Sequence, residues 1–335
     1  MNDVSVVVCT YTSERLDLLR ETLTSLKGQQ GVTAEVIVVV DGSQELEAEL
    51  KADPFYSWVK VIASDGPRGL SAARNSGITA SKKAFVAFID DDATADPFWL
   101  ERQLAAFQDP KVMVTGGAVL PKLAAERPYW WPREFDWVIG CSFPGQLPDR
   151  AFPHGEGALE PSLRGEPVRN VIGASMVFRR RALAKVGGFS LGLGRVDKIP
   201  LGGEETEICI RVGKEYGPGS VVLVPGSVVH HYVPAERLRS DYFMRRCYAE
   251  GLSKALLSRL VRSTKSVSSE ATYLVRTLPL AALRYLASVL RGDLSALARA
   301  MTLGVATSVT GMGWLRGQFV TTPQDSAPVR VARSR

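Results

Sequence analysis

The feature that most constrains the fold is an alternation of short apolar runs with longer segments of helical periodicity. Five runs rich in Val and Ile predict strands: Val4–Cys9, Glu35–Val40, Val59–Ala63, Ala84–Ile89 and Val112–Leu120. The first run is too continuously apolar for a strand with one solvated face, which favours a parallel strand buried on both faces. Leucines every three or four residues from Leu16 to Leu26 predict an amphipathic helix with Ser13 as its N-cap. This order predicts an α/β fold with a mostly parallel, doubly wound sheet.

The alternation continues, with one interruption, through the second hundred residues. Leu70–Ser81 has a helical pattern, Val171–Phe178 and Ser220–His231 predict strands, and helices are expected over RRRALAKVGG and EETEICIRVGKEYG. Between these segments, residues 124–167 are rich in Pro, Gly and aromatic side chains and have no clear period. Such a length without regular structure is typical of an insertion that shapes a substrate site, or of a lid.

Cysteine usage and the amino terminus both bear on the compartment. Four cysteines are spread along 335 residues with no CxxC pair, which argues against a zinc ribbon or a disulfide scaffold and favours a reducing compartment. The first residues, MNDVSVVVCTY, have no basic n-region and include an aspartate, so they predict a strand and not a signal peptide. We therefore expect a cytoplasmic protein.

The basic charge is concentrated in the last third of the chain. Residues 1–234 hold 25 Lys and Arg against 29 Asp and Glu, whereas residues 235–335 hold 16 against 6. Arginines alternate there with apolar stretches, and the uncharged run Met301–Leu315 is shorter than the roughly 20 residues of a membrane span. Two interpretations remain open: helices packed on the preceding domain, or a basic amphipathic segment bound peripherally to the anionic inner face of the cell membrane.

Polar side chains follow three of the expected strands, at the sheet edge where open α/β sheets bind ligands. They are Thr10 and Tyr11 after the first strand, Asp41 and Gly42 after the second, and Asp90, Asp91 and Asp92 after the fourth. The helix between these strands carries Arg74 and Asn75. Alternation along a strand puts Asp90 and Asp92 on one side, where they could share a Mg²⁺ or Mn²⁺ ion. The alternative is an acidic turn or a helix cap, since a helix is expected after Asp96.

Asp41 and the missing phosphate-binding motifs narrow the class of ligand. A carboxylate at this strand end can accept a hydrogen bond from a base or a ribose hydroxyl, and Gly42 allows a close approach, although a simple Asp-Gly turn is the alternative. No GxGxxG follows the first strand, and no GxxxxGK[ST] occurs. The sequence therefore disfavours a dinucleotide-binding enzyme and a P-loop nucleotide hydrolase.

A second acidic cluster opens the helix after Gly203. Glu204, Glu205 and Glu207 lie where the helix dipole stabilises negative charge, and one of them could serve as a general base. Arg211 lies four residues after Glu207 and is expected to pair with it on the helix face.

Two histidines end the last predicted strand. Alternation turns only one of His230 and His231 toward the cleft, where it would be a candidate third ligand beside the aspartates.

Seven segments of this chain, in their order, resemble family 2 glycosyltransferases of the GT-A fold. They are VSVVVCTYTSER, VIVVVDGS, GLSAARNSGI, FIDDD, GASMVFRRRALAKVGGF, GGEETEICIR and VVHHYVP, and they cover about residues 4–235. The resemblance implies an inverting catalytic domain over residues 1–235. The composition of the remaining residues predicts a basic helical extension over 236–320 and a polar, basic tail over 321–335 that is expected to be disordered. The absence of a QxxRW-type motif favours transfer of a single sugar over polymer synthesis.

The resemblance also implies roles for the strand-end residues. A UDP- or GDP-sugar donor would contact Thr10, Tyr11, Asp41, Gly42, Arg74, Asn75, Asp90 and Asp91. Asp90 and Asp92 match the family's DxD-like motif for Mg²⁺ or Mn²⁺, and His231 resembles the later ligand of the metal or the diphosphate. The glutamate pair resembles the family's Glu-Asp motif, which makes Glu205 the base that deprotonates the acceptor. Because glutamate stands where aspartate is usual, Glu204 remains the alternative.

The acceptor side is implied by segments that resemble members acting on lipid-linked or cell-envelope glycans. The corresponding residues are Trp131, Trp137, Gly173, Ala174 and Ser175. An acceptor hydroxyl or phosphate is expected, and no nucleic-acid partner. Two other classes stay open: a sugar-1-phosphate nucleotidyltransferase, which CTYTSERLD disfavours because it lacks the required glycines, and a non-catalytic module that binds a membrane or a partner.

Overall fold

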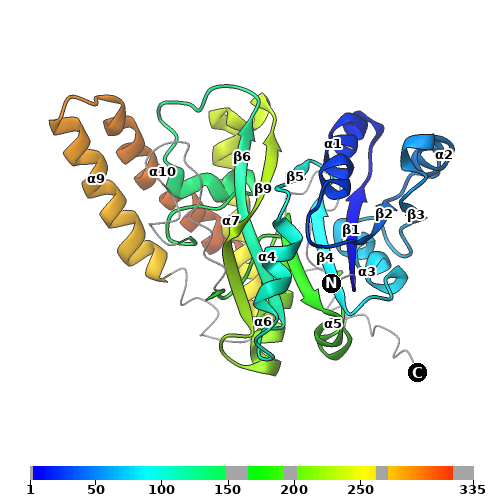
Figure 1. Cartoon of the computed structure of the whole chain (residues 1–335). Coiled ribbons are helices and arrows are strands. Elements are labelled where there is room, and N and C mark those ends of the chain that lie inside the picture. Colours follow the sequence, from blue (N-terminus) through cyan, green and yellow to red (C-terminus); the bar gives the residue numbers. More distant parts are fainter. Residues whose placement is uncertain (1–2, 148–164, 192–201, 262–270, 320–335) are drawn as a thin grey trace. The chain divides into compact units, whose positions relative to one another are not determined.

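The structure is a computed structural model that describes residues 3–147, 165–191, 202–261 and 271–319 (Figure 1). These residues form two compact units. Unit 1 contains the described residues up to Leu120 and from Gly165 to His231, and unit 2 contains those from Pro121 to Leu147 and from Tyr232 onward. The expected insertion at 124–167 lies partly outside the described residues, and its described part up to Leu147 belongs with the carboxyl-terminal helices. The predicted tail at 321–335 also lies outside them.

Four parallel strands form the first half of the sheet. β1 (Val4–Thr10) lies between β2 (Glu35–Val40) and β4 (Phe85–Asp90), and β3 (Lys60–Ala63) pairs with β2. The side chains of β1, β2 and β4 are buried almost throughout, as expected for parallel strands covered on both faces. Continuous apolar runs thus predicted these strands to within one residue of their observed ends.

The second half of the sheet contains antiparallel pairs. β8 (Ser175–Arg179) pairs antiparallel with β4 and with β6 (Val114–Leu123), and β9 (Val221–Val233) pairs antiparallel with β5 (Ala93–Ala95) and β7 (Glu166–Pro167). The strand order is β3-β2-β1-β4-β8-β6-β9-β5. The sheet is therefore mixed, and the direction of β8 departs from the all-parallel order that successive β-α units alone would give.

Helices cover the sheet of unit 1. They are α1 (Leu16–Lys27), α2 (Gln44–Ala52), α3 (Leu70–Ala80), α4 (Trp99–Ala106), α5 (Arg180–Val186) and α6 (Glu204–Tyr216), with short 3₁₀ turns at Ser13–Arg15 and Pro54–Tyr56. The predicted N-cap of the first helix is wrong, because α1 follows Arg15, whose side chain makes no capping hydrogen bond. Ser13 lies inside the preceding 3₁₀ turn, which Thr12 caps: its hydroxyl oxygen accepts from the backbone N–H of Glu14.

The core of unit 1 packs α3, α5 and α6 against the sheet. Side chains of β1, β2 and β4 contact those of the three helices in one buried cluster, which includes Val7, Ile37, Phe88, Ile78, Leu183 and Ile208. Each such burial contributes about 1.5–3 kcal/mol. Gly77 of α3 is required by close packing, since a Cβ there would lie 2.3 Å from a methyl carbon of Val7. This packing fixes the carboxyl ends of β1, β2 and β4 at one edge of the sheet.

Unit 2 is mainly helical. Its elements are η3 (Arg133–Ile139), η5 (Ala235–Leu238), α7 (Ser240–Val261), the π-helical turn η7 (Tyr273–Thr277), α9 (Leu278–Leu290) and α10 (Ser295–Gly317). Helices α7 and α10 approach closely through glycines, because a Cβ on Gly313 would lie 2.1 Å from the carbonyl oxygen of Tyr248. Among the described residues, the 18-residue segment Tyr273–Leu290 is long and apolar enough to cross a membrane by length and composition.

Candidate active site

The carboxyl ends of β1 and β2 bring Thr10 and Asp41 together. The backbone N–H of Asp41 donates to the carbonyl oxygen of Thr10 at 2.8 Å, and Asp41 Oδ2 accepts from the backbone N–H of Gly69 at 2.9 Å. Gly42 follows with φ of +74°, a left-handed conformation that glycine adopts at little cost. Asp41 is buried and held in one orientation, whereas Tyr11 is 47% exposed.

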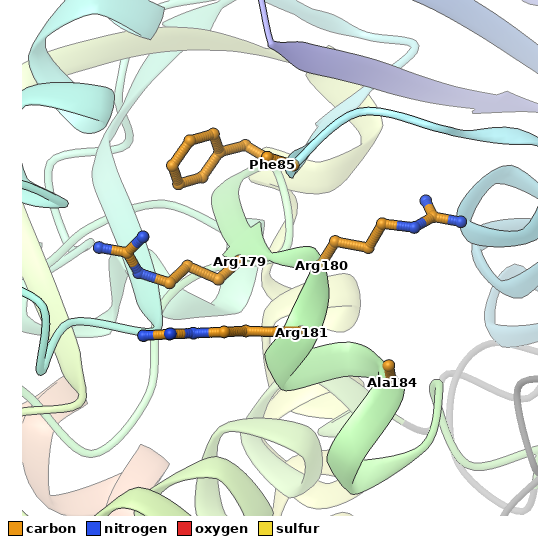
Figure 2. Close-up of a pocket in the computed structure, with 6 residues that line it drawn as sticks. Phe85, Arg179, Arg180, Arg181 and Ala184 are labelled. Carbon is orange, nitrogen blue, oxygen red and sulfur yellow. The ribbon is translucent and has the colours of Figure 1, made fainter. Parts of the chain in front are cut away.

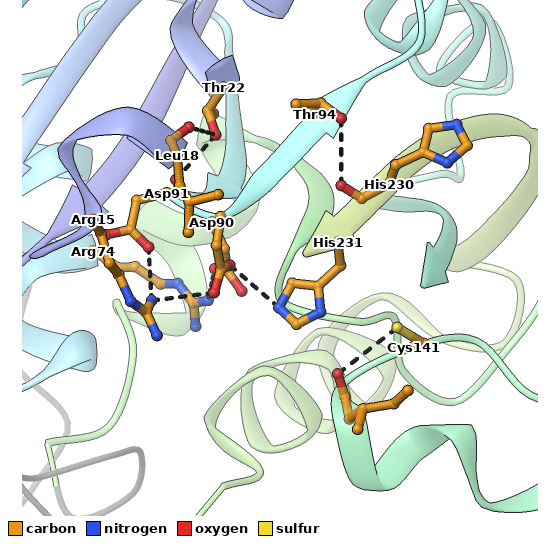
Figure 3. Close-up of polar contacts among 12 residues, drawn as sticks. Arg15, Leu18, Thr22, Arg74, Asp90, Asp91, Thr94, Cys141, His230 and His231 are labelled. Carbon is orange, nitrogen blue, oxygen red and sulfur yellow. Dashed lines mark hydrogen bonds and ion pairs between the residues drawn. The ribbon is translucent and has the colours of Figure 1, made fainter. Parts of the chain in front are cut away.

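Asp90, Asp92 and His231 converge on one point at this edge. Asp90 ends β4, Asp92 directly precedes β5, and Ala93 of β5 lies opposite His231 of β9. One side-chain ligand atom from each of the three residues lies within 4.8 Å of the others, and His231 Nε2 is 3.2 Å from Asp92 Oδ1 (Figure 3). Asp92 and His231 are buried, and Asp90 is partly exposed. The β5–β9 ladder thus explains how residues 139 positions apart come to share a site.

The neighbouring histidine is turned away from this site. His230 lies opposite Thr94 in the same ladder, and its Nε2 is 3.1 Å from an oxygen of Asp96. Successive side chains of a strand point to opposite faces. The structure therefore brings His231, and not His230, to the aspartates.

Arg15 holds the other side of the aspartate triplet. Its Nη1 is 3.0 Å from Asp91 Oδ1 and 3.1 Å from Asp92 Oδ2. The Asp91 carboxylate also accepts from the Thr10 side chain. Burial, together with the charge of Asp92, raises the pKa of Asp91 to about 6, although Arg15 acts to lower it. Arg15 was not among the site residues predicted from the sequence, where its only signal is a basic side chain shortly after the first strand.

Arg74 links the triplet to the second acidic cluster. Its buried guanidinium donates from Nη1 to Glu204 Oε1 at 2.9 Å, and its Nη2 is 3.3 Å from Asp90 Oδ1. Gly173 makes room for it, because a Cβ there would lie 2.8 Å from Arg74 Nη2. The three aspartates and Glu204 are thus paired with two arginines, which leaves two formal negative charges.

The glutamates of α6 have different surroundings. Glu204 is buried and bound by Arg74, whereas Glu205 is partly exposed. Glu207 lies one turn further along and pairs with Arg211 at 2.6 Å, which confirms the predicted pair on the helix face.

Asn75 is adjacent to Arg74 but does not join the cluster. Its Oδ1 accepts from the backbone N–H of Phe189 at 2.7 Å, and its Nδ2 donates to the Phe189 carbonyl oxygen at 2.9 Å. The amide therefore ties α3 to the segment after α5. Backbone groups bind both polar atoms, so Asn75 has a structural role, and its contact with the donor stays a prediction.

The predicted acceptor residues of unit 1 lie in its interior. Ser175 is fully buried, and its Oγ accepts from the indole N–H of Trp99 at 2.9 Å. Ala174 is 3% exposed. Both side chains are buried, and Gly173 lies against Arg74 as described. The acceptor role of these residues stays a prediction.

The predicted acceptor tryptophans belong to unit 2. Trp131 is 1% exposed, its indole N–H donates to Asp136 Oδ1 at 3.0 Å, and its ring lies 4.7 Å from that of Phe243. It is therefore packed in the core of unit 2, and its contact with an acceptor stays a prediction. Trp137 is partly exposed and donates to the hydroxyl of Tyr273 at 3.2 Å.

A surface hollow of about 380 Å³ lies at the opposite end of β4 (Figure 2). It is lined by Ala84, Phe85, Arg179, Arg180, Arg181 and Ala184. Arg179 and Arg180 donate to the carbonyl oxygens of Val112 and Ile78, so both guanidinium groups hold backbone segments together. Phe85 begins β4 and Asp90 ends it, so the length of the strand, about 17 Å, separates the hollow from the carboxylates.

The Asp90–Asp92–His231 group suits a hard divalent cation. Two carboxylates and an imidazole reach one position, and carboxylate oxygens are preferred ligands of Mg²⁺ and Mn²⁺. The two uncompensated negative charges of the surrounding cluster match the charge of such an ion. These three residues could therefore hold the metal.

A family model decides the class of the protein. The model described as glycosyl transferase family 2 matches residues 5–187. The chain belongs to glycosyltransferase family 2. Membership confirms the resemblance found in the sequence and makes the protein a glycosyltransferase, which replaces both the nucleotidyltransferase and the non-catalytic alternatives.

Individual relatives support the same class. This glycosyltransferase is 33% identical over 260 residues to the glucosyl-dolichyl phosphate glucuronosyltransferase of Haloferax volcanii, covering 77% of this chain and 78% of the relative. It is 30% identical over 213 residues to the pre-mycofactocin glycosyltransferase of Mycobacterium tuberculosis, covering 63% of this chain and 39% of the relative.

Solved structures show the fold of this glycosyltransferase. It resembles the mannosyltransferase PcManGT from Pyrobaculum calidifontis, solved with GDP-Man and Mn²⁺, with a TM-score of 0.53, 17% identity and coverage of 92% and 87% of the two chains. It also resembles GalNAc-T7, solved with UDP, GalNAc and Mn²⁺, with a TM-score of 0.52, 17% identity and coverage of 77% and 50%. These likenesses confirm the predicted GT-A fold.

Proposed function

We propose that this chain is a metal-dependent, inverting glycosyltransferase that moves one sugar from a UDP- or GDP-sugar to a lipid-linked or cell-envelope glycan acceptor. The observation that carries the proposal is the convergence of Asp90, Asp92 and His231 beside the buried Arg74–Glu204 pair. A Mg²⁺ or Mn²⁺ ion held there would stabilise the negative charge of the departing nucleoside diphosphate. Asp41, fixed by Gly69, is suited to accept a hydrogen bond from the nucleoside.

Glu205 is the proposed base for the acceptor hydroxyl. Glu204 is buried with one oxygen bound to Arg74, so it is better suited to positioning Arg74 and Asp90 than to taking a proton. Glu205 is the next residue on α6 and is partly exposed, as a group that meets an acceptor must be. A single displacement by the deprotonated hydroxyl inverts the anomeric carbon.

The acceptor class and the location of the enzyme belong to the same proposal. The relative from Haloferax volcanii is named for a glucosyl-dolichyl phosphate substrate, which supports an acceptor carried on a lipid. The basic excess of residues 235–335 and the apolar segment Tyr273–Leu290 support peripheral binding to the cytoplasmic face of the membrane.

The test is a transfer assay with purified protein. A panel of UDP- and GDP-sugars is offered with glycosylated polyprenyl phosphates, with Mn²⁺ or with excess EDTA, and product stereochemistry is read by NMR. We expect inverted product only with metal, and loss of turnover in Asp92→Ala. Glu205→Gln should bind donor normally and lose transfer. Asp96→Asn, which alters a partly exposed aspartate four residues after Asp92, serves as the matched control. Full activity in EDTA would refute metal dependence, and normal transfer by Glu205→Gln would refute its role as the base.

A further inference from the structure

Helix α10 exposes apolar side chains where a solvated helix normally carries charge. Seven of them recur at helical spacing along one face and are each at least 48% exposed: Leu294, Leu297, Met301, Val305, Met312, Leu315 and Phe319. No charged residue lies between Arg299 and Arg316. A surface helix of a globular protein turns its apolar stripe toward the core. The stripe on α10 faces solvent and lacks a partner within the described residues.

Helix α9 repeats this pattern beside α10 (Figure 1). Its exposed side chains are Leu280, Leu283, Leu286 and Leu290, the last 89% exposed. Arg284 is its one charged residue. Soluble monomers rarely expose contiguous apolar patches larger than a few hundred Å². Two adjacent apolar faces therefore indicate a binding surface.

The opposite face of α9 is held by polar contacts within unit 2. Buried Glu134 accepts from Arg284 at 3.1 Å and from the hydroxyl of Tyr285 at 2.8 Å, and its carbonyl oxygen accepts from Tyr273 at 2.6 Å. Crossing a membrane would break these bonds and leave the Glu134 carboxylate buried without them. The helix is therefore suited to lie in a membrane interface and not to cross it.

Charge around the two helices identifies the occupant. Arg276, Arg291 and Arg316 are exposed before, between and at the end of the two helices. The only acidic residue from 271 to 319 is Asp293, which pairs with Arg299 at 2.5 Å. A second copy of the chain would bring arginines against arginines, whereas anionic lipid headgroups offer opposite charge beside an apolar layer.

We propose that the outer faces of α9 and α10 form a lipid-docking surface that inserts its leucines and methionines into the interface of an anionic bilayer without crossing it. This assigns a surface to the membrane association proposed above, and it does not depend on the chemistry of sugar transfer. The arginines would lie at the headgroup level while the apolar stripes lie among the acyl chains.

The test is sedimentation of the full chain with vesicles of phosphatidylcholine, with and without phosphatidylglycerol. We expect binding that requires phosphatidylglycerol and weakens with salt. Leu290→Gln, Met301→Gln and Leu315→Gln together should weaken it at least about tenfold. The control, Trp58→Gln with Phe98→Gln, removes exposed aromatic side chains of unit 1 and should bind as wild type.

A second pair of variants tests the charge. Arg276→Gln, Arg291→Gln and Arg316→Gln should each weaken binding to anionic vesicles by about fivefold. Lys51→Gln, Lys82→Gln and Lys111→Gln remove equal charge from exposed positions of unit 1 and should have little effect.

Three results would overturn the proposal. The first is unchanged vesicle binding by the triple apolar variant. The second is a dimer in solution that this variant dissociates, since a second copy would then cover the face. The third is a Leu290→Cys thiol that is modified only from the vesicle lumen, since α9 would then cross the bilayer. The proposed activity is tested separately, because Asp92→Ala should still bind vesicles and the triple apolar variant should still bind donor with Mn²⁺.

Discussion

Replacing Arg74 by methionine should be among the most destabilising single changes in unit 1. The Arg74 and Glu204 side chains are only 3% and 8% exposed and lie 2.9 Å apart, so the change leaves the Glu204 carboxylate buried without its partner. Removing one member of a buried ion pair costs about 3–5 kcal/mol. The contact with Asp90 adds less, because that carboxylate is 33% exposed and at 3.3 Å.

A double-mutant cycle isolates this pair. Urea unfolding followed by tryptophan fluorescence gives the free energy of unfolding of wild type, Arg74→Met, Glu204→Gln and the double variant. The double variant no longer buries an unpaired charge. Its decrease in the free energy of unfolding should therefore be smaller than the sum of the decreases in the two single variants, by at least about 1 kcal/mol. Lys51→Met, in an exposed pair with Glu47, is the control and should cost less than about 1 kcal/mol. If the decreases in the two single variants sum to that of the double variant within about 0.5 kcal/mol, Arg74 and Glu204 are not coupled and the reasoning is refuted.

Two further predictions concern Asn75 and two buried cysteines. Asn75→Ala should lower the free energy of unfolding by about 1–3 kcal/mol, because it leaves the backbone N–H and carbonyl groups of Phe189 without their hydrogen-bond partner. Donor affinity should stay within about threefold of wild type. A large rise in donor Kd with unchanged stability would contradict this prediction. Burial raises the pKa of the Cys209 and Cys247 thiols to about 12, so stability from these protonated thiols is complete below pH 9 and is lost as the pH rises toward 12. The native protein should therefore resist iodoacetamide at pH 8 and react after urea unfolding, and rapid native labelling at either cysteine would contradict it.

The parallel half of the fold could be predicted because its cause is local. A strand buried on both faces must be apolar at nearly every position, and β1, β2 and β4 are. The direction of β8 could not be predicted from the sequence, since it depends on pairing with strands distant in sequence. For the same reason, the grouping of residues 121–147 with the carboxyl-terminal helices is not visible in the order of elements.

Placement of the site residues was predictable to a similar degree. Strand ends and side-chain alternation predicted that Asp90, Asp92 and one of two histidines would share an edge, and the β5–β9 register selects His231. The contacts of Arg15 with Asp91 and Asp92 could not be predicted, because Arg15 lies in a turn, where no strand end or side-chain alternation indicates which residues will be neighbours. The burial of Trp131 was not predictable either, because an aromatic residue in a loop-like sequence can lie at the surface or in a core.

The most direct test of the account is Mn²⁺ binding measured by electron paramagnetic resonance in the presence of UDP or GDP. We predict one Mn²⁺ per wild-type chain, binding weakened at least about tenfold in Asp92→Asn and in His231→Ala, and wild-type binding in Asp96→Asn. Undiminished binding of one Mn²⁺ by both Asp92→Asn and His231→Ala would contradict the assignment of the metal to these residues.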